Sequence, residues 1–173
     1  MINDFVKVDK SRFNDAIKAY FIWKDLNGII KNSHSRGVNF PETISETLCC
    51  FATGFVLNKA FGGDAYDTEN NKIIEIKASS NWDKDTTSFS PSEKFDKLYF
   101  LRLNQREDEL YIYDIGIDST DLKSIKVNKN ETLQQQQEQG RRPRFSIIKN
   151  LIEVNNILPI LKINLRTKKI IQL

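Results

Sequence analysis

The sequence is poor in the residues that build zinc sites and disulfide frameworks. It has one histidine and two cysteines, and the cysteines are neighbours, Cys49 and Cys50, in an apolar stretch. Adjacent cysteines rarely bridge each other, so we expect two buried thiols in a reducing compartment. The same scarcity leaves no plausible tetrahedral zinc site.

Long apolar runs are also absent. No segment approaches the ~20 apolar residues that a membrane-spanning helix requires. The N-terminal stretch Met1–Lys7 is polar where a signal peptide would carry its apolar segment. With 39% hydrophobic and 28% charged residues in a chain of 173, the composition is that of a globular protein. We therefore expect one cytoplasmic domain, residues 1–173, with no membrane partner.

Charge is unevenly distributed along the chain. From Arg141 onward there are eight basic residues and one acidic residue, Glu153, which give that segment a net charge of +7. Because the whole chain carries +3, the first 140 residues carry −4. A basic segment joined to a mildly acidic body indicates a polyanionic partner.

Hydrophobic spacing predicts two helices at the start of the chain. Residues 11–31 have one apolar helical face. Pro41 suits the first turn of a second helix, which is apolar around most of its circumference and which we expect to run to about Ala60. Gly62-Gly63 then interrupts the pattern.

Strand patterns follow. Residues 64–79 are typical of two strands joined by a turn at 68–71, and the runs 98–101 and 110–113 are typical of a second hairpin. We expect a short helical turn near Pro91, a polar stretch at 119–142, a helix at 145–152 and a last strand at 161–166. The order predicts an α/β (α+β) fold with a mixed central β-sheet flanked by helices.

The residues most suggestive of chemistry are Asp64, after the Gly-Gly break, and Glu75-Ile76-Lys77. Side chains alternate along a strand, so Glu75 and Lys77 share one face. A hairpin would bring Asp64 next to them. Two carboxylates can hold a hard divalent cation such as Mg²⁺, which polarises a phosphate and lowers the pKa of bound water. A neighbouring lysine can orient that water or stabilise transition-state charge.

The three letters alone are weak support, because strands often carry a surface salt pair at this spacing, worth only ~0–1 kcal/mol. Asp121-Leu122-Lys123 meets the same minimal pattern in a polar stretch without a strand signal. The β-branched strand, the Gly-Gly break and a preceding helix that carries Glu46 favour the first site.

This arrangement resembles the PD-(D/E)xK nuclease superfamily, in particular small type II restriction endonucleases of bacteria. The resemblance covers about residues 40–115, with Gly63 in place of the proline in the superfamily's name. It implies a restriction-endonuclease-like fold and Mg²⁺-dependent cleavage of both strands of duplex DNA at a short palindromic site, for which we expect G·C pairs. It also implies a homodimer. We expect Mn²⁺ to substitute for Mg²⁺, and no nucleotide cofactor.

Carried over residue by residue, the resemblance makes Asp64 and Glu75 metal ligands, the Ile76 carbonyl a further ligand, and Lys77 the catalytic lysine. Glu46 becomes a supporting ligand or water-binding group, although acidic residues near a helix N-terminus also favour the macrodipole. Asp67 is interpreted as an ordinary turn residue.

For DNA contact we single out the segment 119–173, a polar and basic insert and tail. Arginine pairs bidentately with guanine and glutamine with adenine, which favours major-groove reading, although a solvated polar loop is the simpler alternative. The loop 32–39 is a second candidate, and its His34 is interpreted as a loop or DNA-contact residue. The tail residues Lys162, Arg166, Lys168 and Lys169 contact phosphate or are simply exposed. The predicted DNA-binding residues are Arg36, Asn39, Gln137, Arg141, Arg142 and Arg144.

Three other functions remain open. The first is a repair or recombination nuclease of the same superfamily that recognises DNA structure. The second is a non-catalytic DNA-binding protein in which Glu75 and Lys77 are only a salt pair. The third is an interaction protein whose basic tail binds an acidic partner.

Overall fold

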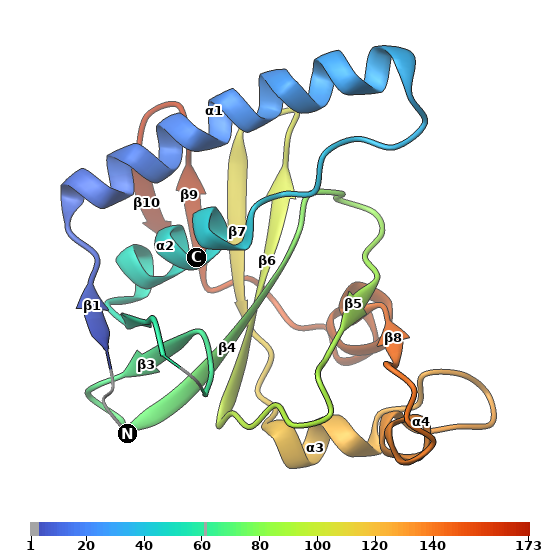
Figure 1. Ribbon diagram of the computed structural model, residues 1–173. Helices are drawn as coiled ribbons and strands as arrows, with labels where there is room; N and C mark the ends of the chain where they lie inside the picture. The colour runs from blue at the N-terminus through green and yellow to red at the C-terminus, as the bar shows by residue number, and fades with distance from the viewer. Residues whose placement is uncertain (1–3, 61) are drawn as a thin grey trace.

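The computed structural model describes residues 4–60 and 62–173. Within them, an eight-stranded sheet forms the centre and helices cover both faces (Figure 1). Strands β4 and β6 run parallel, and the other neighbours are antiparallel, so the sheet is mixed as the sequence predicts. In sheet order the strands are β1 (Phe5–Lys7), β2 (Val56–Asn58), β3 (Ala65–Asp67), β4 (Lys72–Ser79), β6 (Lys97–Asn104), β7 (Glu109–Asp114), β9 (Leu161–Asn164) and β10 (Lys169–Gln172).

Helices α1 (Lys10–Ser33) and α2 (Glu42–Thr53) cover one face of the sheet. Figure 1 shows α1 lying across the strands, with α2 beneath it. The Asp9 side chain accepts a hydrogen bond from the Arg12 main-chain N–H at 2.8 Å and so caps α1. The predicted helix at 11–31 is therefore confirmed, because its apolar residues enter the core. The buried set includes Phe13, Ile17, Tyr20 and Trp23.

The second helix is shorter than the sequence predicts. It ends at Thr53, since Gly54 adopts a left-handed conformation (φ +84°) and its N–H bonds to the Cys50 carbonyl. The next apolar residues form β2, which pairs with β1 and β3. The expected helix to Ala60 was wrong because an apolar run is compatible with either a buried helix or a buried strand. Cys49 and Cys50 are free and buried, as expected.

The other face of the sheet carries a second core. It is covered by a two-stranded sheet of β5 (Thr87–Ser88) and β8 (Arg144–Phe145), with α3 (Ser119–Ser124), α4 (Leu133–Glu138) and the π-helix η1 (Ile148–Glu153). The predicted helix at 145–152 corresponds to η1. Near Pro91 the structure has a turn, closed by a bond from the Glu93 N–H to the Ser90 carbonyl, where a helical turn was expected.

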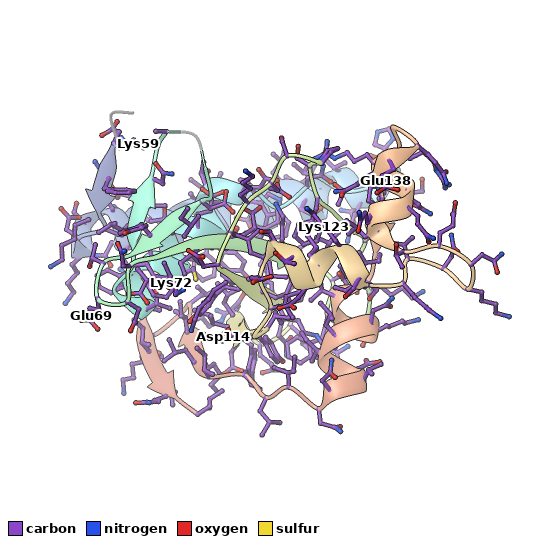
Figure 2. The ribbon with its side chains drawn as sticks, turned by 90° about the horizontal axis from the view of Figure 1, so that it is seen from below. Lys59, Glu69, Lys72, Asp114, Lys123 and Glu138 are labelled. Atoms are coloured by element: carbon purple, nitrogen blue, oxygen red, sulfur yellow. The ribbon has the colours of Figure 1, made fainter. Side chains whose placement is uncertain are left out.

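Residues 119–173 do more than form a polar insert and tail. They supply β9 and β10 to the main sheet, while α3 and α4 occupy the stretch expected to be merely polar. In Figure 2, Lys123 of α3 and Glu138 of α4 lie to the right of Lys59, Glu69 and Lys72, which belong to the region of β2 to β4. Asp121 belongs to a capping box with Asp118, so the Asp121-x-Lys123 pattern is a helix start and not a second site.

None of the helices within residues 4–60 and 62–173 is both long and apolar enough to cross a membrane. The first three residues of the polar N-terminal stretch lie outside the described residues.

Candidate active site

Asp64 lies directly before the first residue of β3, beside β4. Its main-chain N–H bonds to the Ile74 carbonyl at 2.9 Å. Its carboxylate Oδ2 then accepts the Ile76 N–H at 2.7 Å. Because the N–H and C=O of one strand residue project from the same edge, the Ile76 carbonyl projects toward the Asp64 side as well. The hairpin therefore places Asp64 against Ile76, the residue between Glu75 and Lys77 in the predicted site.

Gly63 makes this position possible. It has a φ of +78°, and a Cβ atom there would overlap the Ile73 Cγ2 methyl group. Any other residue would strain the backbone and displace the chain next to Asp64. The Gly-Gly break is thus part of the construction of the site.

Glu75 and Lys77 lie on the same face of β4 and form an ion pair, with their side chains only 3% and 19% exposed. The Lys77 ammonium also lies 3.5 Å from the Glu93 Oε1 atom and 5.3 Å from the centre of the Phe89 ring. The lysine is therefore enclosed by two carboxylates and an aromatic ring. The sequence analysis missed Glu93, which lies in a polar turn without any periodic pattern.

The carboxyl groups of the site resist ionisation. Burial, together with the nearby Asp64, raises the pKa of Glu75 to about 8. Burial also raises the pKa of Asp64. For Glu46 on α2, burial and then the charges of Asp64 and Glu42 raise the pKa to about 7. Burial alone would lower the pKa of Lys77, but Glu75, Glu93 and Asp64 raise it above its ordinary value. The site has more carboxyl groups than the single ammonium of Lys77 can pair with. A bound cation would favour their ionised forms.

The donor chemistry fits a hard divalent cation. Two carboxylates and a main-chain carbonyl are oxygen ligands of the kind that Mg²⁺ prefers. Within the residues that the structure describes, no three His, Cys, Asp or Glu side chains form a ready-made metal cluster. A direct metal contact by Glu46, as a third side-chain ligand, therefore needs a side-chain movement.

A cleft of about 560 Å³ opens beside these residues. Ile76 and Lys77 line it, whereas Asp64, Glu75 and Glu46 lie outside its wall. Its rim comes from the loop after α1 and from the loop between β4 and β5, which approach each other at one side of the sheet (Figure 1). Basic side chains are distributed around it: Lys31, Arg36, Lys84 and Arg142.

The predicted DNA-binding residues separate into two groups. Arg36, Asn39 and Arg142 line the cleft. Arg141 instead pairs with Glu131 at 3.2 Å, beside α4. Glu131 also accepts bonds from side chains of Asn128, Gln136 and Gln139, which lower its pKa to about 2.

Arg144 and Gln137 are not among the cleft-lining residues. Gln137 is half-buried on α4. Arg144 is exposed on β8, opposite Ser88 of the cleft wall. Its strand is fixed by Asp85, whose carboxylate accepts bonds from Ser146 Oγ (2.5 Å), Ile147 N (2.7 Å) and Ile148 N (3.1 Å). Asp85 thus connects the loop after β4 to the start of η1. It thereby also positions β8, which carries Arg144.

The three lysines and the arginine of the C-terminal tail do not line the cleft. Lys162 pairs with Glu109 at 2.9 Å, and Arg166 pairs with the buried Asp108 at 2.5 Å. Lys168 donates to the Asn14 side chain at 3.0 Å, and Lys169 is exposed. Asp67 accepts bonds from the main chain of Glu69 and Asn70, which confirms it as a turn residue.

Comparison with known proteins identifies the family. A family model described as the Bsp6I restriction endonuclease matches residues 8–154. The chain is also 70% identical over 172 residues to the type II restriction enzyme Bsp6I of Bacillus sp. (strain RFL6), covering 99% of both chains. The chain belongs to the Bsp6I restriction endonuclease family.

The match to the Bsp6I family spans the candidate site and its cleft, from Lys31 of α1 to Arg144 of β8. No solved structure is significantly similar to the chain. The resemblance to small type II restriction endonucleases is thus confirmed, and the residue roles within the site remain predictions.

Proposed function

We propose that this Bsp6I family member is a type II restriction endonuclease that hydrolyses both strands of duplex DNA at a short, G·C-containing palindromic site. The observation that carries the assignment of chemistry is the cluster of Asp64, Glu75 and Lys77 at the side of a basic cleft. A salt pair alone would not need a second carboxylate, a glycine with left-handed backbone before it, or an adjoining cleft.

Asp64, Glu75 and the Ile76 carbonyl would hold Mg²⁺ or Mn²⁺, which polarises the phosphate and acidifies bound water. Lys77 lies beside Glu75 and at the cleft wall, so its ammonium can reach a phosphate oxygen or the attacking water. Glu46 is assigned a water-binding role, because no three-carboxylate cluster exists within the described part of the chain.

The basic residues of the cleft would hold the DNA. Lys31, Arg36, Lys84 and Arg142 surround the hollow that Lys77 lines, and Asn39 adds a polar side chain. Phosphate contacts give affinity, while contacts to base edges give sequence specificity. Arg142 and Arg36 have the fork geometry that pairs with guanine. A symmetric homodimer would place one such cleft on each strand of a palindrome.

A plasmid cleavage assay with Mg²⁺, followed by mapping of the fragment ends, tests this function. We expect discrete fragments from the wild-type protein, the same ends in every product, and no fragments from Asp64→Ala. Cleavage of branched DNA alone would favour a structure-specific nuclease. DNA binding without any Mg²⁺-dependent cleavage would contradict the enzymatic function.

A further inference from the structure

Glu93 is a carboxylate of the site that neither the sequence pattern nor the assigned roles use. It closes the turn between β5 and β6, where its N–H bonds to the Ser90 carbonyl at 3.2 Å. Its side-chain Oε2 accepts the Ser90 N–H at 2.9 Å, which fixes the carboxylate in one orientation. The other oxygen, Oε1, lies 3.5 Å from the Lys77 ammonium.

The surroundings of Lys77 explain what a second carboxylate can do. Glu75 forms an ion pair with Lys77. The proposed function requires the same Glu75 to ligate a cation, which reduces the negative charge that remains for the lysine. A lysine on a flexible stem that loses its partner also loses its position. Glu93, anchored through Ser90, keeps a negative charge on the opposite side of that ammonium.

We propose that Glu93 is a positioning residue for Lys77, holding its ammonium in place while Glu75 binds the metal. This inference rests on the proposed function, because it requires Glu75 to act as a metal ligand. Glu93 itself contacts neither metal nor substrate. Its partner is the lysine, and its position is set by the turn.

The alternative is that Glu93 only stabilises the turn. Glu93→Gln separates the two roles, because a glutamine oxygen can still accept the Ser90 N–H but carries no charge. Glu93→Asp keeps the charge on a shorter side chain. Glu69→Gln is the matched control, since it removes a charge from a side chain that is exposed to solvent in the β3–β4 turn.

The steady-state test compares kcat and KM for plasmid cleavage. We expect Glu93→Gln to lower kcat on the order of tenfold, with KM and the thermal midpoint unchanged, and Glu93→Asp to recover part of the loss. Glu69→Gln should behave as wild type. A wild-type kcat for Glu93→Gln, or a loss that accompanies a lower thermal midpoint in both Glu93 variants, would overturn the proposal.

A second test measures Mn²⁺ affinity without DNA, by electron paramagnetic resonance, in a double-mutant cycle. Without Glu93, Lys77 is left to Glu75 alone and competes with the cation for it. Glu93→Gln should therefore weaken Mn²⁺ binding about tenfold in the wild-type background and less than about twofold in Lys77→Met. Equal changes in both backgrounds, or no change in either, would contradict the proposal. Absence of Mn²⁺ binding to the wild-type protein would instead contradict the proposed function.

Discussion

The carboxylate of Asp64, the residue before β3, accepts the main-chain N–H of Ile76 at 2.7 Å, just beyond the last β3–β4 pair, Ala65 with Ile74. This bond satisfies a strand N–H that has no neighbouring strand to receive it. It also aligns Asp64 with the edge from which the Ile76 carbonyl projects. This one hydrogen bond therefore satisfies the β4 main chain and brings together two of the proposed metal ligands, the Asp64 carboxylate and the Ile76 carbonyl.

Gly63→Ala should damage both stability and activity. The left-handed φ and the overlap with the Ile73 methyl group would strain the chain by about 1–3 kcal/mol and shift Asp64. We expect a lower free energy of unfolding in urea and a loss of cleavage rate on the order of 100-fold. Gly28→Ala is the control, because a Cβ there meets nothing within 4 Å; it should retain wild-type cleavage. Wild-type cleavage by Gly63→Ala would show that Asp64 does not need this position.

Arg142→Ala and Arg141→Ala should have different effects on DNA binding. Arg142 lines the cleft, whereas Arg141 is paired with Glu131. We expect Arg142→Ala to weaken DNA binding and to reduce the slope of log affinity against log salt by about 1. Arg141→Ala should leave that slope unchanged. Fluorescence anisotropy with a labelled duplex at several salt concentrations measures both, and the reverse order would refute the assignment of the cleft as the DNA-binding surface.

Metal-free stability should fall as the pH rises from about 4.5 to about 8. Burial raises the pKa of Glu75 to about 8 and that of Glu46 to about 7, so the folded protein binds more protons than the unfolded chain in this window. Each protonated carboxyl stabilises the fold fully at a pH below its pKa in the unfolded chain. This contribution is lost as the pH rises through its pKa in the folded protein. Urea denaturation at a series of pH values checks the slope, which should be smaller in Glu75→Gln. A flat profile in the wild type would contradict the pKa shifts.

Asp108→Asn should destabilise the fold without touching the site. Asp108 is fully buried and accepts bonds from Tyr20 Oη (2.6 Å) and Lys24 Nζ (2.5 Å), while Arg166 pairs with its second oxygen. Loss of the buried charge leaves these partners without compensation, and we expect a cost of about 3 kcal/mol in the free energy of unfolding. Cleavage at low temperature should persist. A change below about 1 kcal/mol would show that the cluster is not a structural anchor.

The sequence predicted much of the sheet and of the strand proposed to be catalytic, because alternation along β4 places Glu75 and Lys77 on one face whatever the rest of the chain does. Other features depend on tertiary contacts. The end of α2 at Thr53 is set by Gly54 and by pairing of β2 with two strands, one of which comes from the N-terminus. Glu93 reaches Lys77 only because the turn at Ser90 folds over β4. Lys31, from the last turn of α1, and Lys84, from the loop after β4, both line the cleft, although their segments show no pattern in common.

The most direct test of the central claim compares Lys77→Ala with Lys123→Ala. Both lysines end an acidic-x-Lys pattern, but Lys77 lies between two carboxylates beside the cleft and Lys123 is exposed on α3. With Mg²⁺ and a plasmid substrate, we predict that Lys77→Ala loses at least about 1,000-fold in cleavage rate while keeping its fold, and that Lys123→Ala cuts as wild type. Wild-type cleavage by Lys77→Ala would contradict the account.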